Sequence, residues 1–387
     1  MEGQTVFHNV PNQLLDSRTT VALLRGAGVS VDFLGDRLSL VSDKYDVGAI
    51  SHELVQKTRY STLLLGVSKA REQCVDMPTP GGCKLNRSVD IHIDGLRALG
   101  ATIVEEAGLI RFKPGKRSGA RFTLRSPSVG ATLNLILASV LGESEVELAN
   151  IAIEPEIVDF VSMLRSAGAR IDWTGERRLV VNGVSALSGI EWRIIPDRIV
   201  AVTYVIAAAM NERGILLRGI EPAHIALPLA VLRDIGLDIH TTSTTLRLYP
   251  TSLGRLLPFV IEARPYPGFP TDLQPIMTAL AACISGTSHI SESVFDTRFQ
   301  YVPYLNRIGS DIQVADRLAT VNGKRPGRAE LHDVDCTDIR GGMSAVLFAM
   351  AGGANVNIAG FQEIERGYAQ PQALFESFGY TLERTGD

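Results

Sequence analysis

The chain has 387 residues, of which 45% are hydrophobic, and a formal net charge of −4. This length predicts two domains that each bury a core, and the slight negative charge argues against a non-specific nucleic-acid binder. Cys74, Cys83, Cys283 and Cys336 show no metal-ligand or disulfide spacing, so we expect no metal and a reducing compartment, the cytoplasm. No apolar run is long enough to span a bilayer, and the start lacks a signal-peptide pattern.

Six segments share one pattern, in which an amphipathic, leucine-rich stretch is followed by a glycine and then by a short alternating strand. The glycines recur at intervals of about 70 residues, which indicates one supersecondary unit repeated along the chain. Each glycine is expected to end a helix in a left-handed conformation and to let the chain reverse into a strand. The six positions are Gly28, Gly100, Gly168, Gly236, Gly309 and Gly379.

The stretch from Ala101 to Gly168 predicts the contents of one unit. ATIVE and LIRF indicate a hairpin, ARFTL a strand, ATLNLILASVLG a helix, SEVELAN a strand and PEIVDFVSMLRSAG a helix. The hairpins favour mixed sheets packed outside buried helices over one parallel doubly wound sheet. We therefore predict an α+β fold, an α/β repeat with three units in each of two lobes, residues 1–197 and 198–387.

The first and last units are expected to be incomplete. Gly28 lies too near the start for a unit of about 70 residues, so the first unit is predicted to lack its first strand and first helix. The sequence after Gly379 ends in TLERTGD, which leaves no room for a second hairpin strand.

The first candidate site is the loop from Met77 to Asp90, MPTPGGCKLNRSVD. Its prolines and glycines place Cys83 on a turn, where Lys84 and Arg87 would lower the thiol pKa and make it reactive. A surface loop with an incidental, inert cysteine is the alternative, because most cysteines have no chemical role.

A second candidate lies in the sequence RPYPGFPTDLQPIMTALAA, which begins at Arg264. Its prolines hold an extended turn that ends at Thr271 and Asp272, where a helix N-cap is expected. Asp272 is therefore either a helix cap or a carboxylate that faces a site. Three arginines, Arg298, Arg340 and Arg366, also lie at turns or helix starts and would form an anion site if they converge.

In this order the motifs resemble the UDP-N-acetylglucosamine enolpyruvyl transferase family. The resemblance runs through nearly the whole chain, in PGGC with RSVD, SVGAT, EPEIVD, PDRI, PGFPTD, VFDTRF, DIR and ERGY. PGGC together with PGFPTD is its most specific part. The related shikimate-phosphate enzymes share the six-unit fold but are not expected to contain the PGGC loop.

The resemblance implies a two-lobed inside-out α/β barrel with the active site between the lobes. It implies transfer of the enolpyruvyl group of phosphoenolpyruvate to a sugar hydroxyl, with release of phosphate and no cofactor or metal. Cys83 would protonate the methylene carbon and Asp272 would take the hydroxyl proton. Arg87, Arg298, Arg340 and Arg366 would bind the anionic groups. The nucleotide-sugar contacts would be Arg59, Arg87, Ser88, Val89, Asp90, Ile91, Ser126, Ser128, Val129, Asp272 and Val294.

The sequence also departs from the family pattern. The family's Lys-Asn pair, whose lysine binds the phosphate of phosphoenolpyruvate, has no counterpart by motif, so we expect reduced activity. Ser126 replaces a basic residue, and Leu85 to Asp90 read LNRSVD instead of GARPVD. Three interpretations stay open: the cell-wall enzyme itself, a paralogue that enolpyruvylates another nucleotide or sugar, and a non-catalytic binding protein.

Overall fold

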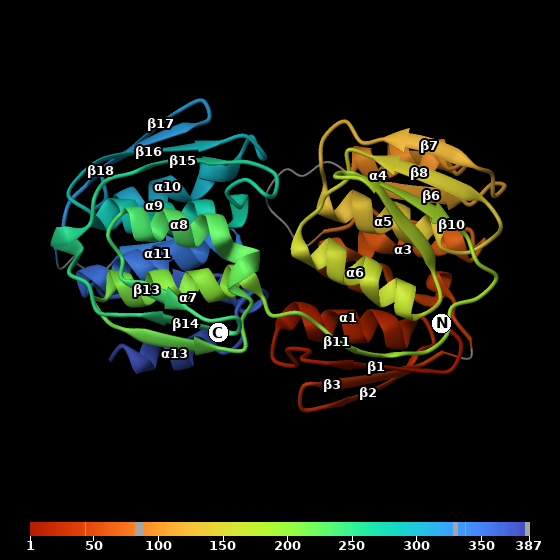
Figure 1. Ribbon diagram of the computed structural model, residues 1–387, viewed down its shortest axis with the longest axis horizontal. Helices are drawn as coiled ribbons and strands as arrows, with labels where there is room; N and C mark the ends of the chain where they lie inside the picture. The colour runs from red at the N-terminus through yellow and green to blue at the C-terminus, as the bar shows by residue number, and fades with distance from the viewer. Residues whose placement is uncertain (43, 82–88, 328–331, 337, 384–387) are drawn as a thin grey trace. The chain divides into compact units, whose positions relative to one another are not determined.

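The computed structural model describes residues 1–42, 44–81, 89–327, 332–336 and 338–383. Contacts divide the chain into two compact units, the first formed by residues 1–12 and 16–195 and the second by residues 13–15 and 196–387. In both units, strands lie outside the helices (Figure 1). No helix of the described residues combines the length and apolar character needed to cross a bilayer.

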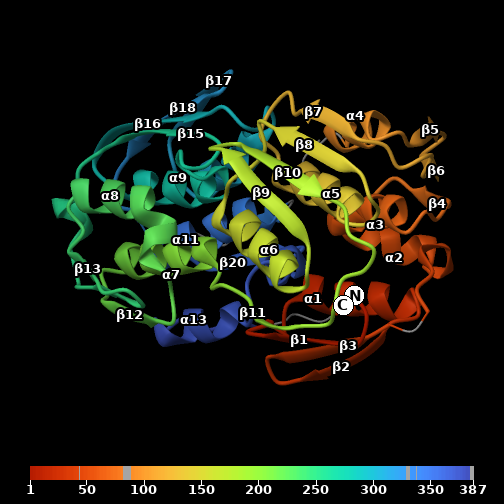
Figure 2. The ribbon, with the colours of Figure 1, turned by 45° about the vertical axis from the view of Figure 1, so that its right-hand side comes forward.

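The described residues of unit 1 form three sheets, with strand orders β11-β1-β3-β2, β4-β6-β5 and β7-β8-β10-β9. Figure 2 shows β8, β9 and β10 side by side. The helices and strands of this unit are β1 (Gln4–His8), α1 (Leu15–Gly26), β2 (Ser30–Leu34), β3 (Arg37–Val41), η1 (Val47–Ala49), α2 (His52–Lys57), η2 (Arg59–Thr62), α3 (Leu63–Ala70), β4 (Val75–Pro78), α4 (Asp90–Ala98), β5 (Thr102–Glu106), β6 (Leu109–Lys113), β7 (Ala120–Thr123), α5 (Val129–Ser139), β8 (Glu145–Ala149), α6 (Pro155–Ser166), β9 (Arg170–Gly175), β10 (Arg178–Asn182) and β11 (Glu191–Arg193).

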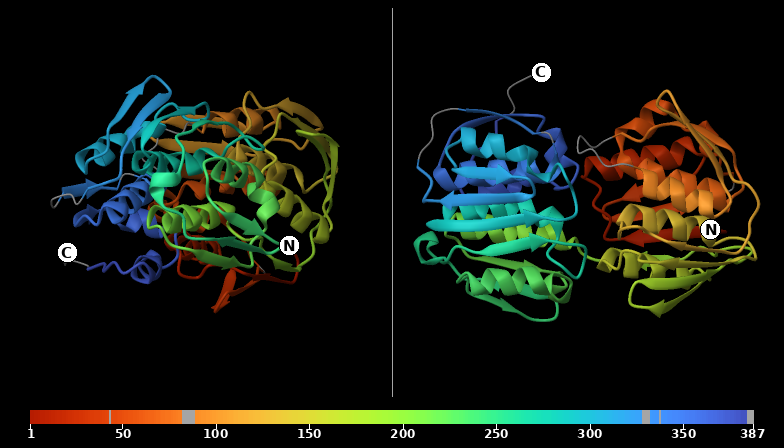
Figure 3. Two further views of the ribbon diagram at one scale, coloured as in Figure 1. Left: turned by 60° about the vertical axis from the view of Figure 1, so that its left-hand side comes forward. Right: turned by 90° about the horizontal axis from the view of Figure 1, so that it is seen from above.

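Three further sheets lie in the described part of unit 2, with strand orders β12-β14-β13, β15-β16-β18-β17 and β19-β20. The right-hand view of Figure 3 shows strands of each unit outside its helices. The helices and strands of unit 2 are α7 (Arg198–Met210), β12 (Ile215–Arg218), η3 (Pro222–Ile225), α8 (Ala226–Asp234), β13 (Ile239–Thr241), β14 (Thr245–Leu248), η4 (Leu253–Arg255), β15 (Val260–Ala263), η5 (Thr271–Leu273), α9 (Gln274–Cys283), β16 (Gly286–Glu292), η6 (Arg298–Tyr301), α10 (Val302–Arg307), β17 (Ile312–Ala315), β18 (Leu318–Gly323), β19 (His332–Asp335), α11 (Ile339–Gly352), β20 (Val356–Ala359), α12 (Gln362–Glu365) and α13 (Pro371–Ser377).

The repeated unit is most complete between β7 and β10 and between β15 and β18. In each, a strand and a buried helix lead to a second, parallel strand, which is followed by a second helix and an antiparallel hairpin. This confirms the mixed sheets expected from the hairpins. Within the described residues the strands form separate open sheets and no closed barrel, so the predicted barrel is present as helices enclosed by these sheets.

All six glycines of the repeat have positive φ, and each lies two residues beyond the end of a helix. Gly100, at φ +89°, follows α4, and the amide of Ala101 donates to Leu96 O at 3.0 Å. This six-residue hydrogen bond is that of a Schellman motif, which needs a left-handed residue and therefore favours glycine. The equivalent bond is present in every unit and is donated by Val29, Ala101, Ala169, Leu237, Ser310 and Tyr380.

In five of the units, a polar side chain three residues before the glycine adds a second hydrogen bond to this connection between helix and strand. In the second unit Arg97 donates to the carbonyl of Ile103, six residues later, at 2.9 Å. This bond ties the last turn of the helix to the first hairpin strand. The residues at this position are Arg25, Arg97, Arg165, Arg233 and Asn306.

The first and last units are incomplete in the described chain. No helix precedes β1 in the described chain, but β1 does have a parallel neighbour, since β11 pairs with it from Val6↔Glu191 to His8↔Arg193. No strand precedes β1 in the described chain either, so the expectation that the first unit lacks its own first strand and first helix is confirmed, and β11, from the end of unit 1, lies beside β1 in its sheet. In the last unit, residues 380–383 form no strand, so both hairpin strands are absent from the described part and not the second alone.

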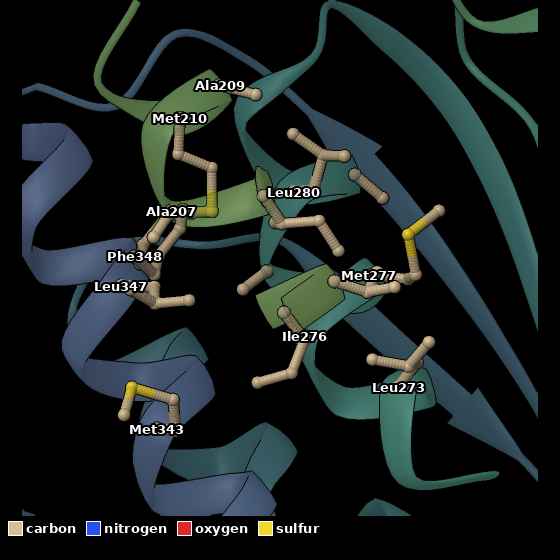
Figure 4. Packing of buried hydrophobic residues seen from close by; sticks show 14 of the residues in the cluster. Ala207, Ala209, Met210, Leu273, Ile276, Met277, Leu280, Met343, Leu347 and Phe348 are labelled. Atoms are coloured by element: carbon tan, nitrogen blue, oxygen red, sulfur yellow. The ribbon is translucent and has the colours of Figure 1, made fainter. Parts of the chain in front are cut away.

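The core of unit 2 is built by three helices whose surfaces are apolar on every side, the pattern of a buried helix. Every residue of α9 is buried, as are Gly341 to Met350 of α11 and most of α7. Figure 4 shows Met210 of α7, Leu280 of α9 and Phe348 of α11 packed in one cluster.

In unit 1 the central contact is between α3 and α5, where a Cβ on Gly66 would lie 2.3 Å from Asn134 O. Only glycine fits this crossing.

Candidate active site

Asp272 lies in the 3-10 turn η5, directly before the buried helix α9. The expectation that it stands at a helix N-cap is wrong, because Pro270 takes that position for η5 and Leu273 takes it for α9. Its Oδ1 instead accepts a hydrogen bond of 2.9 Å from Arg298 Nη2. The Asp272 side chain is 41% exposed, whereas that of Arg298 is 1% exposed. The carboxylate is therefore held by a buried cation and remains accessible to a substrate.

Arg298 is fixed by more than its carboxylate partner. Its Nε and Nη2 also donate to the backbone carbonyl of Thr271, at 3.3 and 3.1 Å, and its guanidinium lies 5.9 Å from the ring centroid of Phe295. Charge-assisted bonds from a planar guanidinium constrain direction as well as distance. Arg298 thus holds the segment Thr271–Asp272 in one orientation.

Arg340, on the first turn of α11, is a further cation beside this pair. The N-cap of that helix is Asp338, whose carboxylate accepts from the amides of Arg340 and Gly341, both at 3.0 Å. Burial acts to lower the pKa of Arg340, but Tyr368, Asp272 and Asp197 outweigh it and raise that pKa above its ordinary value. Arg340 therefore remains charged at every physiological pH.

The Arg340 guanidinium is also incompletely hydrogen-bonded. It lies 5.0 Å from the ring centroid of Tyr368, and its buried Nη1 has no hydrogen-bond partner among the described residues. An unsatisfied, buried guanidinium donor is costly. A bound anion would supply the missing acceptor.

Arg366 and Val294 complete the predicted residues of unit 2. Arg366 follows α12, is 10% exposed and donates to Glu363 at 2.8 Å. A Cβ on the next residue, Gly367, would lie 3.5 Å from Arg340 Nη1, so this segment runs against Arg340. The amide of Val294 donates to Glu292 Oε1 at 2.7 Å.

In unit 1, Arg59 and the start of α4 lie close together. Arg59 begins η2, and its charge acts on His92 of α4. Burial, and then Arg59, lower the pKa of His92 from 6.5 to about 4. Its Nδ1 is 3.1 Å from Asn134 Nδ2, and Asn134 Oδ1 accepts from the amide of Gly66 at 2.8 Å. A neutral histidine thus links α4 to α5 and α3.

The predicted nucleotide-sugar contacts of unit 1 lie at the starts of two helices. Asp90 and Ile91 begin α4 after the buried Val89, and the carboxylate of Asp90 pairs with Arg125. Ser128 is the N-cap of α5, with its Oγ accepting from the amide of Ala131 at 3.3 Å, while Val129 begins that helix and Ser126 is exposed on the preceding bend. Cys83, Arg87 and Ser88 lie outside the described residues.

The sequence interpretation missed four residues that the structure places at these positions. Arg125 is the partner of Asp90, and Glu292, Asp197 and Tyr368 contact or act on the predicted residues of unit 2. The sequence did contain a signal for two of them, because Arg125 is a basic residue directly before Ser126 and Asp197 belongs to the PDRI motif. Tyr368 and Glu292 gave none, because their roles depend on burial. No group of three or more His, Cys, Asp or Glu within the described part of the chain is arranged to hold a metal ion.

Comparison with known proteins identifies the family. Residues 1–372 match the family of EPSP synthase (3-phosphoshikimate 1-carboxyvinyltransferase). UDP-N-acetylglucosamine 1-carboxyvinyltransferase 1 of Carboxydothermus hydrogenoformans is 36% identical over 98% of this chain and 89% of its own length. The UDP-N-acetylglucosamine 1-carboxyvinyltransferase of Gloeobacter violaceus is 37% identical over 98% of this chain and 82% of its own length.

Solved structures show the same fold. The enolpyruvyl transferase NikO from Streptomyces tendae matches with a TM-score of 0.87 and 21% identity, covering 98% of this chain and 89% of its own. An EPSP synthase from Acinetobacter baumannii matches with a TM-score of 0.70 and 17% identity, covering 99% of this chain and 91% of its own. With these matches over nearly its whole length, the chain belongs to the EPSP synthase superfamily of enolpyruvyl transferases and, within it, to the UDP-N-acetylglucosamine 1-carboxyvinyltransferase family.

Proposed function

We propose that the chain transfers the enolpyruvyl group of phosphoenolpyruvate to a hydroxyl of UDP-N-acetylglucosamine, with release of phosphate, as a cytoplasmic step of peptidoglycan precursor synthesis. The observation that carries the proposal is an accessible carboxylate, Asp272, bound to the buried Arg298 beside the incompletely bonded Arg340. Relatives at 33 to 37% identity are UDP-N-acetylglucosamine 1-carboxyvinyltransferases, which supports this acceptor.

The reaction adds an alcohol across a double bond and then eliminates phosphate. The acceptor oxygen bonds to C2 of phosphoenolpyruvate while a proton is added to C3, and the hydroxyl proton leaves to a base. Loss of phosphate from C2 and of a proton from C3 then restores the double bond in the product. We assign the hydroxyl proton to Asp272 and the C3 proton to Cys83, because the two steps need a base near oxygen and an acid near carbon.

Asp272 suits a base that acts late in the addition. Its hydrogen bond to Arg298 stabilises the charged carboxylate, which makes it a weak base toward an unactivated hydroxyl. We expect the proton to move only as the new C–O bond forms. Arg298, Arg340 and Arg366, together with Arg87, would hold the phosphate and carboxylate of phosphoenolpyruvate, since fixed guanidinium groups match both anions and stabilise charge that develops during addition.

The acceptor would be recognised through the remaining predicted residues. We assign nucleotide-sugar contacts to Arg59, to Arg87 to Ile91, to Ser126, Ser128 and Val129, and to Val294. A different nucleotide or sugar acceptor is the second candidate, because Ser126 stands where the family pattern has a basic residue and the charge of this bend comes from Arg125, which pairs with Asp90.

Phosphate release measured with phosphoenolpyruvate and each acceptor in turn tests both candidates. Release that depends on UDP-N-acetylglucosamine, with a product that gains one enolpyruvyl group by mass spectrometry, supports the first. Release that depends only on another uridine nucleotide or another sugar supports the second. Binding of phosphoenolpyruvate without release for any acceptor would overturn the catalytic proposal.

A further inference from the structure

Glu292, the last residue of β16, has a buried carboxylate that accepts three hydrogen bonds from two separate segments. The residue is 1% exposed. Its Oε2 accepts from Thr271 Oγ1 at 2.8 Å, and its Oε1 accepts from the amides of Val294 and Phe295 at 2.7 and 3.2 Å. One side chain therefore connects η5 to the turn that follows β16.

Both connected segments contain residues of the proposed site. Thr271 precedes Asp272, and its carbonyl accepts two bonds from Arg298. Val294 is a proposed nucleotide-sugar contact, and the ring of Phe295 lies 5.9 Å from the Arg298 guanidinium. Loss of the Glu292 carboxylate would release Thr271 on one side and the Val294–Phe295 turn on the other. Both sides of Arg298 would lose support.

Stability alone does not explain a carboxylate at this position. Burial raises the pKa of Glu292, and the bonds from Thr271, Val294 and Phe295 offset this only in part. A buried ionic group of this kind is often replaced by a neutral one at no cost to stability. What the carboxylate provides instead is a fixed geometry, because three bonds to one carboxylate hold both segments in place.

The two arginines near Glu292, Arg298 and Arg317, are each paired with an aspartate. Arg298 acts on the Glu292 carboxylate directly and itself pairs with Asp272. Arg317, whose carbonyl accepts from the Glu292 amide at 2.9 Å, forms an ion pair with Asp296. Arg298 is thus the cation that favours the ionised form of Glu292.

We propose that Glu292 is a positioning residue of the transfer reaction, which holds Asp272, Arg298 and the Val294–Phe295 turn at fixed spacing through its ionised carboxylate. The proposal rests on the proposed function and deepens it, because Glu292 would set the position of Asp272, the proposed base, through its bonds to neighbouring residues. Protonation of Glu292 removes the negative charge from the carboxylate that both segments bind. The Thr271–Asp272 segment and the Val294–Phe295 turn therefore separate more readily as the pH falls.

Hydrogen exchange in the full chain without substrate tests the connection by itself. We expect the amides of Val294 and Phe295, after correction for intrinsic exchange, to lose protection in wild type as the pH falls through the raised pKa of Glu292. In Glu292→Gln, whose amide oxygen still accepts but does not titrate in this range, protection should be lower and independent of pH. Glu262→Gln is the matched control, because Glu262 is half-exposed and pairs with Arg264; it should behave as wild type.

Steady-state kinetics test the consequence for turnover. In Glu292→Gln we expect kcat to fall by roughly tenfold to a hundredfold, with a smaller change in the KM for phosphoenolpyruvate, as for lost orientation of catalytic groups. Equal exchange in wild type and Glu292→Gln at every pH, or an unchanged kcat, would overturn the proposal. If wild type releases no phosphate with any acceptor, the proposed function fails, while the exchange result still decides whether Glu292 holds the two segments.

Discussion

Two substitutions at Asp272 separate its role in catalysis from its role in holding Arg298. Asp272→Asn keeps an oxygen that accepts from Arg298 Nη2, so the free energy of unfolding should change by about 1 kcal/mol, the value of an ordinary hydrogen bond. Asp272→Ala removes the carboxylate from Arg298, which is 1% exposed, and leaves its hydrogen bonds to the Thr271 carbonyl. Breaking a fully buried pair costs about 3 to 5 kcal/mol, and because Asp272 is 41% exposed we expect about 2 kcal/mol here.

Catalysis should respond differently from stability. Neither variant can take the hydroxyl proton, so both should lower kcat by roughly 10² to 10⁴, the usual contribution of a general base. Phosphate release gives kcat, and urea unfolding followed by circular dichroism gives the free energy. Near-wild-type kcat in Asp272→Asn would refute the assignment of the base. Equal stability of the Asn and Ala variants would refute the structural role given to the ion pair.

Two other predictions concern His92 and Cys83. The pKa of His92 is lowered to about 4 by burial, so its stabilising effect is complete above pH 6.5 and is lost as the pH falls toward 4, by about 3 kcal/mol in total at 1.36 kcal/mol per unit. The free energy of unfolding, measured across this range, should depend less on pH in His92→Gln than in wild type, whereas the exposed control His52→Gln should behave as wild type. The same pH dependence in all three proteins would contradict this. Cys83 should alkylate fastest and be protected by phosphoenolpyruvate, as mass spectrometry after brief labelling would show; faster labelling of Cys74, which is exposed, would rule out the assignment.

Much of the fold could be read from the sequence because it rests on local rules. A glycine after an amphipathic stretch specifies a helix end, and all six adopt the positive φ that this requires. The polar residue three positions earlier was part of the same pattern, yet its bond to a strand carbonyl depends on where the strand starts. The pairing of β1 with β11, almost the whole of unit 1 apart in sequence, follows from tertiary packing and had no local signal.

The candidate site was less predictable for a related reason. Residue types and motif order pointed to Asp272, Arg298 and Arg340, but the ion pair between the first two joins positions 26 residues apart. The sequence pattern left Asp272 as either a helix cap or a site carboxylate, because it could not show that Pro270 takes the N-cap position. Glu292 lay in an ordinary strand pattern, and only its burial and three donors distinguish it.

The measurement that tests the central claim most directly is phosphate release from phosphoenolpyruvate by wild type and by Asp272→Asn, each with and without UDP-N-acetylglucosamine. We predict release by wild type that requires the acceptor and yields a product with one added enolpyruvyl group, and a rate at least a hundredfold lower in Asp272→Asn. Acceptor-dependent release at the same rate in both proteins, or no release by wild type, would contradict the account.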